Sequence, residues 1–389
     1  MKKRINVTRP SIPPFEEYAE EIKSVWESGM LTNFGPLEEK LKGQLEAFLG
    51  VKNLPLFANG HQALMAAIRT VALPGRRTVI TTPFTFASTT EAITGAGLRP
   101  LFADVDPVTY TLDPEKVEAL INEDTAAIVP VHVYGNVCDV EKFDEISRKY
   151  GIPVIYDAAH CFGVKINGKG AGVFGAASMF SFHATKAFNS VEGGGVTVAD
   201  SELADRIKRY ANYGLSGADC DLQGTNAKMT EFSAAMGICN LRHIGEVTLR
   251  RKAVCEIYRD VLTRGAGFDR ATGQCDLGFK LLPEQDGVEK NYAYFPVIFG
   301  NISKDGRAFV SDGGKTVERC IAALEAENVF PRRYFYPLTS EFSCMKEFNT
   351  SKTPVAKVLS ENALCLPLYA DLEPEDAERI ASTVRGCIS

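Results

Sequence analysis

Short apolar runs alternate with amphipathic stretches through the first half of the chain, and few folds accommodate that pattern. Runs rich in β-branched and aromatic residues predict strands at 54–58, 77–81, 99–103, 125–131 and 152–157. Stretches with helical spacing predict helices at 61–73, 83–97, 114–122 and 140–151. This alternation predicts an α/β fold, with a largely parallel sheet covered by helices on both faces.

The pattern changes after residue 157. Apolar strands are predicted at 176–182 and 194–199 with no helix between them, so part of the sheet is expected to be mixed. Further helices are predicted at 202–214 and 230–247.

The length of the chain, 389 residues, exceeds the roughly 250–300 residues at which a single core stops growing. Past residue 250 the elements are less regular, with predicted strands at 293–299 and 364–369 and a predicted helix at 316–329. We therefore expect a large α/β domain over 15–250 and a smaller α+β domain over 251–389. The N-terminal segment 1–14 is expected to pack on the small domain.

Charge and composition exclude several classes of function. The 49 acidic and 43 basic residues are spread along the chain, with a formal charge of −6 and no run of five like charges. This balance argues against a nucleic-acid groove or a polybasic membrane patch. There is no stretch of about 18 apolar residues, and the basic N-terminus is not followed by an apolar segment. Neither a membrane span nor a secretory signal is therefore expected.

The cysteines and histidines give no metal signature. The ten cysteines form no CxxC pair, and the five histidines do not lie at metal-ligand spacings with them, so no metal site is expected. Scattered thiols in a chain of this size are typical of a reducing compartment, which predicts a cytoplasmic protein. Each cysteine is expected to be a small buried core residue.

Ligands of open α/β sheets bind at the carboxyl ends of the strands, and three groups of reactive residues lie just past predicted strand ends. Asn59, Gly60 and His61 connect the first strand to a helix. A glycine turn lets backbone amides approach an anion, and a helix N-terminus favours negative charge, so this turn is a candidate phosphate site. The alternative is a simple turn glycine.

Asp157 ends the most apolar predicted strand, IPVIYD. A carboxylate at that position is desolvated unless it faces a cation or a strong donor. The alternative is a loop carboxylate that caps backbone amides. His160 follows three residues later, either as a site residue or as a hydrogen-bonded structural histidine.

Lys186 lies in a segment that also carries Phe180, Phe182 and Phe188. An ammonium in an apolar pocket has a pKa below the usual value of about 10.4, and the resulting neutral amine is nucleophilic, as a Schiff-base lysine must be. The alternative is a surface lysine whose alkyl chain covers apolar neighbours.

Together these residues match the needs of pyridoxal phosphate. This cofactor requires a lysine for its aldehyde, a carboxylate for its ring nitrogen and donors for its phosphate. Lys186, Asp157 and the turn at Gly60 supply one of each. Phe86, in TTPFTFAST, is the aromatic residue expected to stack on the pyridine face.

Several longer segments carry a family pattern. In chain order they are LTNFGP (31–36), ANGHQAL (58–64), TTPFTFAST (81–89), FADVDP (102–107), VHVYGNVCDV (131–140), YDAAHCFGV (156–164), FSFHATK (180–186), EGGG (192–195) and TNAKMTEFSAAMG (225–237). They resemble, in the same order, the DegT/DnrJ/StrS family of sugar aminotransferases, within fold type I of the pyridoxal-phosphate enzymes. The last third resembles the family more loosely, through RRYFYPL (332–338) and LCLPLY (364–369).

The resemblance implies catalytic roles. Lys186 corresponds to the lysine that bonds the cofactor aldehyde and shuttles protons during transamination. The family's dehydratase relatives carry His at that position. Asp157 corresponds to the carboxylate that keeps the pyridine nitrogen protonated. His160 stands where the family has Gln or His, near the phenolic oxygen of the cofactor.

The resemblance also implies a phosphate site. Gly60 and Ser181 correspond to phosphate-binding residues, and Asn226 corresponds to a residue that reaches the phosphate in the neighbouring subunit, which implies a homodimer with shared active sites. His61 stands where the family usually has Thr or Ser, so either the imidazole replaces that hydroxyl or the contact is lost. Thr339 follows a PL motif that is often followed by His in the family.

The implied reaction moves an amino group from glutamate to a nucleotide-linked keto-sugar. The FSFHATK and EGGG segments resemble members that aminate C4, and the whole pattern is similar to dTDP-4-keto-6-deoxyglucose 4-aminotransferases, which serve lipopolysaccharide, O-antigen or natural-product biosynthesis. His183 is either a sugar contact or a packing residue. The alternatives are a 3-keto-sugar or aminocyclitol aminotransferase, and a non-catalytic regulatory or binding protein. The last would be expected to lack Lys186 or Asp157, and both are present.

Overall fold

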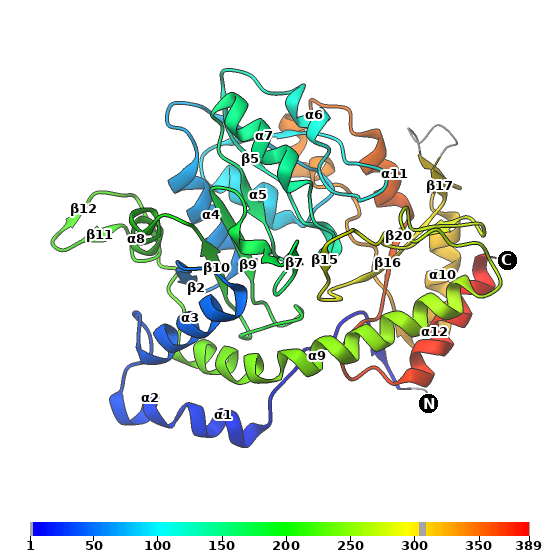
Figure 1. Ribbon diagram of the computed structural model, residues 1–389, viewed down its shortest axis with the longest axis horizontal. Helices are drawn as coiled ribbons and strands as arrows, with labels where there is room; N and C mark the ends of the chain where they lie inside the picture. Colours follow the sequence, from blue (N-terminus) through cyan, green and yellow to red (C-terminus); the bar gives the residue numbers. More distant parts are fainter. Residues whose placement is uncertain (1–2, 303–308, 389) are drawn as a thin grey trace.

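A central sheet organises the larger part of the molecule in the computed structural model, which describes residues 3–302 and 309–388 (Figure 1). One set of strands has the order β2 (Leu56–Phe57), β10 (Gly194–Thr197), β9 (Ala177–Ser181) and β6 (Ile155–Asp157). A second set has the order β4 (Arg99–Phe102), β3 (Thr78–Thr81) and β5 (Thr125–Val129). Parallel bridges between Ile128 and Val154 and between Val131 and Asp157 join the two sets into one sheet.

Most strands of this sheet are parallel, and one runs in the opposite direction. Strand β9 is parallel to β6, and β3 is parallel to both β4 and β5. Strand β10 runs antiparallel to both of its neighbours, β2 and β9. The expectation of a mixed sheet is therefore confirmed. Because β9 and β10 are joined by a loop rather than a crossover helix, the chain must reverse between them.

The helices around the sheet begin and end where local chemistry dictates. They include α4 (Gly60–Val71), α5 (Ala87–Gly95), α6 (Pro114–Glu118), α7 (Val140–Tyr150) and α8 (Ser201–Tyr210). Asp113 caps α6 by accepting a hydrogen bond from the Glu115 amide, with Pro114 in the first helical position, as predicted. Gly151 ends α7 in the left-handed conformation, with φ of 64°, which also confirms the predicted end.

Several predicted helix boundaries are wrong, among them the end of α8, which is Tyr210 rather than residue 214. Helix α5 begins at Ala87 rather than near residue 83, because the preceding Phe86 is extended and serves as its N-cap. Helix α6 ends at Glu118, short of residue 122. Helix α9 (Glu231–Thr263) continues well past the predicted end at 247. Its last turns remain helical because they bury apolar side chains, such as those of Tyr258 and Leu262, in a second core.

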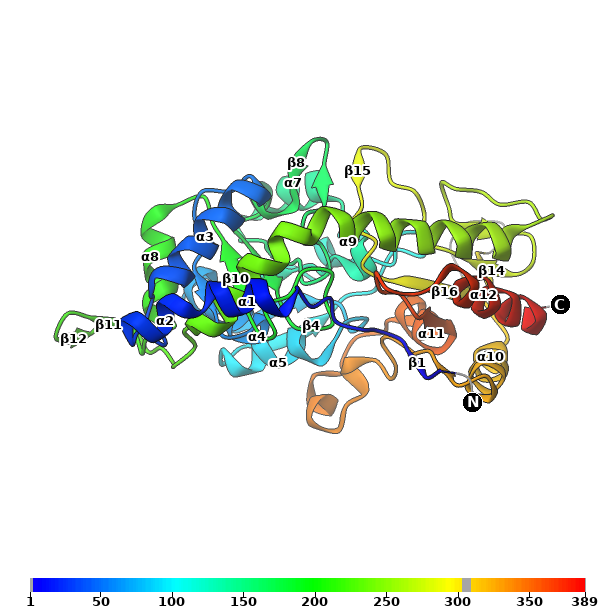
Figure 2. The ribbon, with the colours of Figure 1, turned by 90° about the horizontal axis from the view of Figure 1, so that it is seen from below.

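The second core lies in the C-terminal part. It packs the end of α9 against α10 (Lys315–Ala326) and α12 (Pro374–Ile388). A sheet there has the order β13 (Gln274–Cys275), β14 (Phe279–Lys280), β16 (Phe295–Phe299) and β20 (Ala363–Leu366). Strand β1 (Ile5–Asn6) pairs in parallel with β19 (Val329–Phe330), and Ile5 belongs to this core. Figures 1 and 2 show α9 running along the molecule from the part with the central sheet to the C-terminal part. The predicted division at residue 250 falls inside this continuous helix and stays a prediction.

The remaining elements are shorter or peripheral. The helices are α1 (Phe15–Glu21), α2 (Lys23–Ser28), α3 (Pro36–Leu49) and α11 (Pro354–Asn362), with 3-10 turns η1 (Val133–Gly135), η2 (Ala171–Val173), η3 (Thr339–Glu341) and η4 (Ser343–Phe348). The strands are β7 (Lys165–Ile166), β8 (Lys169–Gly170), β11 (Leu215–Ser216), β12 (Asp219–Cys220), β15 (Val288–Glu289), β17 (Asn301–Ile302) and β18 (Phe309–Val310).

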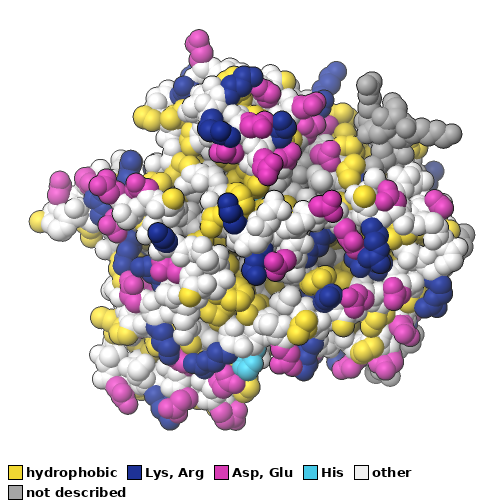
Figure 3. Space-filling model, viewed as in Figure 1, with side chains coloured by type: hydrophobic (Ala, Val, Ile, Leu, Met, Phe, Trp, Pro, Cys, Tyr) yellow, Lys and Arg dark blue, Asp and Glu magenta, His cyan; other side chains and the backbone are white. Residues whose placement is uncertain are grey.

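The surface carries charges of both signs, interspersed over the face in Figure 3. Among residues 3–302 and 309–388, none of the helices combines the length and the apolar character needed to cross a bilayer.

Candidate active site

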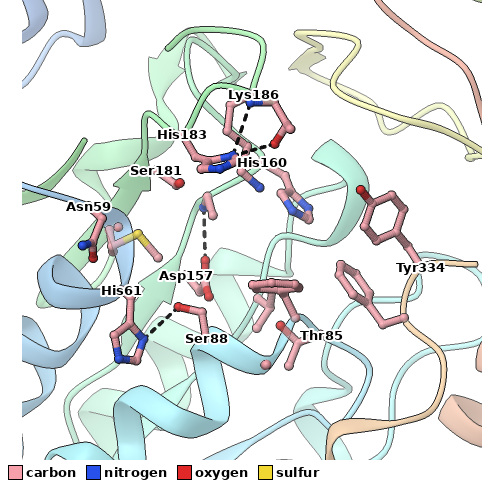
Figure 4. Close-up of a pocket in the computed structure, with 18 of the residues that line it drawn as sticks. Asn59, His61, Thr85, Ser88, Asp157, His160, Ser181, His183, Lys186 and Tyr334 are labelled. Atoms are coloured by element: carbon pink, nitrogen blue, oxygen red, sulfur yellow. Dashed lines mark hydrogen bonds between the residues drawn. The ribbon is translucent and has the colours of Figure 1, made fainter. Parts of the chain in front are cut away.

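A cavity of about 580 Å³ opens at the carboxyl ends of β6 and β9 (Figure 4). The N-termini of α4 and α5 form one side, and the 332–335 segment from the C-terminal part closes another. The predicted site residues that line it are Gly60, His61, Phe86, Asp157, His160, Ser181 and Lys186. The structure therefore brings together residues that the sequence separates by more than a hundred positions.

Lys186 lies in the loop between β9 and β10, where its amide donates to the His183 carbonyl at 2.9 Å. Its Nζ donates to the Tyr294 hydroxyl oxygen at 3.4 Å. Burial lowers the pKa of Lys186 to about 8, while the nearby charge of Asp157 acts in the opposite direction. A large part of this amine is therefore neutral near pH 8 and able to attack a carbonyl carbon.

The expected phenylalanine pocket around Lys186 is corrected. Phe180, Phe182 and Phe188 are fully buried in the hydrophobic core, and none of them lines the cavity. The rings of Phe182 and Phe188 meet at 5.2 Å between centroids and fix the base of the loop. The aromatic residue beside the amine is Tyr294, whose phenol pKa is raised by burial, so that it stays protonated.

Asp157 is the last residue of β6 and is 4% exposed. Its Oδ2 accepts a 2.8 Å hydrogen bond from the Thr89 hydroxyl, and its Oδ1 accepts a 3.1 Å bond from the Ala159 amide. Burial raises the pKa of this carboxyl, and the two hydrogen bonds together with the Lys186 charge oppose that rise. Asp157 therefore accepts a hydrogen bond from a backbone amide, as one expectation had it, and also has a hydroxyl donor and the Lys186 charge beside it, as the other had it.

His160 is buried beside Asp157, and its Nδ1 accepts a 3.1 Å hydrogen bond from the Tyr134 amide. Burial holds its pKa well below the usual range, so the ring is neutral and carries its proton on Nε2. The ring packs against Tyr294 and Phe335, at 4.6 and 6.0 Å between centroids. His160 can therefore donate one hydrogen bond from Nε2.

The N-terminus of α4 lies at one end of the cavity. Asn59 caps the helix by accepting from the Gln62 amide at 2.9 Å, and the first amides of a helix have no intrahelical partner. Ser181 lies directly opposite Gly60, so close that a Cβ at Gly60 would be 2.9 Å from the Ser181 Cβ. The His61 Nδ1 is 3.1 Å from the Ser88 Oγ, which brings the start of α5 to the same end of the cavity.

These groups fit pyridoxal phosphate. The cavity holds an amine of lowered pKa, a buried carboxylate with both oxygens oriented, and a helix N-terminus with hydroxyl and imidazole groups beside it. Phe86 lines the cavity and is 54% exposed, so its ring is accessible for stacking. The chemistry of this donor set is that of the cofactor's aldehyde, ring nitrogen and phosphate.

Two residues singled out in the sequence lie away from the cavity. Asn226 is exposed, and its Oδ1 accepts a 2.7 Å hydrogen bond from the Lys228 Nζ. Thr339 is buried, and its amide and hydroxyl both donate to the Pro83 carbonyl, at 3.1 and 3.2 Å. Thr339 therefore ties the C-terminal part to the start of the α5 segment instead of facing the cavity.

Several cavity residues escaped the sequence analysis. They are Thr85, Ser88, Tyr294, Arg332, Tyr334 and Phe335. Tyr294 is 108 residues from Lys186 in the sequence, and no local sequence pattern predicts their contact. Thr85 and Ser88 belong to the TTPFTFAST segment, so a search of that segment for hydroxyl groups would have found them.

Known proteins are similar to this chain over almost its whole length. A model of the DegT/DnrJ/EryC1/StrS aminotransferase family matches residues 15–385. The chain is 35% identical over 387 residues to the dTDP-4-amino-4,6-dideoxy-D-glucose transaminase of Shigella dysenteriae, and 33% identical over 392 residues to the transaminase of that name from Escherichia coli. Each alignment covers 99% of both chains.

A solved structure is similar over the same length. The crystal structure of DesI in the presence of its TDP-sugar product superposes with a TM-score of 0.87 at 30% identity, covering 100% of this chain and 94% of the other. The predicted α/β, fold type I architecture is confirmed, and the protein is a pyridoxal-phosphate-dependent aminotransferase. The chain belongs to the DegT/DnrJ/EryC1/StrS aminotransferase family.

Proposed function

We propose that this enzyme transfers the amino group of glutamate to C4 of dTDP-4-keto-6-deoxyglucose. The observation that carries the proposal is full-length similarity to two enzymes named for dTDP-4-amino-4,6-dideoxy-D-glucose. Amination of a ketone at C4 of the 6-deoxy sugar gives that kind of amino sugar. The alignments leave no large part of either chain unmatched, so a cavity of the same general shape is expected.

In the proposed mechanism, Lys186 and Asp157 do the proton chemistry. Bound pyridoxal phosphate supplies an electron sink for the negative charge that develops at the amino-acid Cα. Lys186, as a neutral amine, takes the proton from Cα and returns it at C4′ of the cofactor, a transfer of the kind that contributes about 10²–10⁴-fold. Asp157 would hold a proton on the ring nitrogen, and His160 would donate from Nε2 to the phenolic oxygen.

The remaining residues hold the cofactor in place. Gly60 and His61 offer backbone amides to the phosphate, and Ser181 offers its hydroxyl. Phe86 would stack on one face of the cofactor ring. These roles are supported by the position of each residue on the cavity wall.

We also propose a homodimer in which Asn226 completes the phosphate site of the second subunit. Asn226 is exposed and does not line the cavity of its own chain, which agrees with such a role. Large apolar side chains are exposed between residues 12 and 31, among them Trp26, which is 71% exposed. Apolar surface of this kind is typical of a face that another chain covers.

The proposed setting is the cytoplasm, where glutamate and nucleotide sugars meet. All ten cysteines are free thiols, as a reducing compartment favours. The amino sugar would then serve the biosynthesis of a surface glycan such as an O-antigen, or of a natural product. We also propose the two-domain division at about residue 250, which is supported by an apolar core formed almost entirely by residues that follow it.

A single-turnover experiment tests the substrate. Enzyme loaded with pyridoxamine phosphate prepared from ¹⁵N-glutamate is mixed with dTDP-4-keto-6-deoxyglucose or with the 3-keto isomer, and the sugar products are identified by NMR. We expect ¹⁵N at C4 of the first sugar, slow or absent amination of the second, and no product with Lys186→Ala. Preferred amination at C3 would overturn the proposal.

A further inference from the structure

Two buried threonines form a chain of hydrogen bonds that ends on Asp157. The Thr85 and Thr89 hydroxyl oxygens are 2.8 Å apart, and the Thr89 hydroxyl donates to the Asp157 Oδ2 at 2.8 Å. Thr85 is 2% exposed and Thr89 is 1% exposed. Thr89 lies in the first turn of α5, whereas Thr85 precedes Phe86, the N-cap residue of that helix. Thr85 also lines the cavity near Asp157 (Figure 4).

The direction of donation in this chain follows from the carboxylate. An ionised carboxylate only accepts hydrogen bonds, so the single proton of the Thr89 hydroxyl must point to Asp157. Thr89 then has no proton left for Thr85, so Thr85 is the donor in the bond between them. Each bond polarises the next, which strengthens the final bond to the charged oxygen.

The hydrogen bonds from the two threonines matter because few other groups stabilise the Asp157 carboxylate. The titratable groups around Asp157 are Lys186, His160, Cys138 and Cys161. Burial keeps His160 and both thiols neutral, so Lys186 supplies the one positive charge among the described neighbours. Lys186 is also the amine proposed to bond the cofactor, and its charge is then not available to Asp157. The Thr89 hydroxyl and the Ala159 amide remain as the donors that hold the carboxylate.

We infer that Thr89, supported by Thr85, is a positioning residue that keeps Asp157 ionised and fixed for its contact with the cofactor's ring nitrogen. The inference rests on the role proposed above for Asp157. Thr89 and the Ala159 amide occupy one lone pair on each carboxylate oxygen. A second lone pair on each oxygen remains for the ring nitrogen proton, so the donors set the orientation without blocking the contact.

Matched variants in the holoenzyme test this inference. Thr89→Val removes the donor with little change in shape, Thr89→Ser keeps it, and Thr85→Val removes only the outer hydroxyl. Thr90→Val is the control, because Thr90 is a buried neighbour in the same helix whose hydroxyl donates to the Ala87 carbonyl at 3.0 Å instead. The first readout is the ¹⁵N chemical shift of ring-labelled pyridoxal phosphate as a function of pH, which reports the ring nitrogen proton independently of turnover.

We expect a protonated ring nitrogen at pH 8 in the wild type, Thr89→Ser and Thr90→Val. Thr89→Val should lose that proton at a lower pH than the wild type and react with glutamate about 10–100-fold more slowly, the range for a hydrogen bond to a charged group. Thr85→Val, which does not touch Asp157, should change both readouts in the same direction by less. Should Thr89→Val not fold, Thr85→Val alone carries the test.

The outcomes separate this inference from the proposed function. Suppose that Asp157→Asn loses the ring proton but Thr89→Val matches Thr90→Val in both readouts. The hydrogen bonds from the threonines are then only structural and the inference is overturned. The same holds for Thr85→Val where Thr89→Val does not fold. If Asp157→Asn retains the ring proton, the role proposed for Asp157 fails first, and the inference fails with it.

Discussion

The Nζ of Lys186 and the hydroxyl of Tyr294 are 3.4 Å apart, and they come from opposite parts of the molecule. Lys186 lies in the loop that follows β9, while Tyr294 immediately precedes β16 in the C-terminal sheet. The reactive amine is therefore held by a residue that reaches the cavity only when the C-terminal part packs against the central sheet. Folding of both parts is a condition for the chemistry.

Tyr294→Phe should retain the covalent cofactor but turn over more slowly. Loss of one neutral hydrogen bond is worth about 1 kcal/mol, or roughly fivefold, and Lys186 would be less well held whenever it is not bonded to the cofactor. Steady-state kinetics with glutamate should show the loss in kcat. A variant without bound cofactor would mean that Tyr294 does more than position the amine.

Cofactor capture by the apoenzyme should depend on pH through Lys186. Below about 8 the amine is mostly protonated and cannot attack the aldehyde, so the capture rate should rise about tenfold per pH unit. Above about 8 the rate should level off, because the amine is already neutral. Stopped-flow absorbance after mixing apoenzyme with pyridoxal phosphate measures this profile.

A matched variant isolates the amine in that experiment. Lys186→Ala should bind the cofactor without the covalent phase, and its remaining absorbance change should not follow the same profile. A wild-type rate that is flat between pH 6 and 9 would contradict a pKa lowered by burial.

His61→Ala should weaken cofactor retention. The His61 ring is bonded to Ser88 at the end of the cavity where α4 begins, so its loss should raise the Kd for pyridoxal phosphate about tenfold. Equilibrium dialysis of the apoenzyme measures this, and inorganic phosphate should compete less well in the variant. His183→Ala is the control, because His183 lines the same cavity but bonds to Thr185. Equal weakening in both variants would argue against a phosphate role for His61.

Gly60→Ala should destabilise the fold through a steric clash. A Cβ at Gly60 would lie 2.9 Å from the Ser181 Cβ, and overpacking of this kind costs about 1–3 kcal/mol. Gly43→Ala is the comparison, because Gly43 lies in α3 with open space around its Cβ position and should gain about 0.5–1 kcal/mol. Urea unfolding monitored by circular dichroism distinguishes the two. An unchanged midpoint for Gly60→Ala would mean that β9 can move away.

Much of the fold and the site could be predicted from local pattern. Strand–helix alternation specifies a parallel sheet, and the direct β9–β10 connection specifies its antiparallel member. Reactive residues at strand ends meet at one edge, so Asp157 and Lys186 could be placed together before their contacts were known. The predicted start of α6 at Pro114 and the predicted end of α7 near residue 151 also agree with the structure.

Contacts between distant segments could not be predicted. Tyr294 reaches Lys186, and Thr339 reaches the Pro83 carbonyl, only through packing of the C-terminal part. The length of α9 was also missed, because its later turns are held by apolar packing in the second core rather than by an end signal. Phe86 was expected inside a helix, and its extended conformation follows from its position as the cap of α5.

Borohydride reduction of the holoenzyme, followed by proteolysis and mass spectrometry, tests the central claim most directly. The account predicts one modified peptide, with the pyridoxyl group on the Lys186 Nζ, and none in Lys186→Ala. A pyridoxyl group on another side chain of the wild type, or no modified peptide at all, would contradict it.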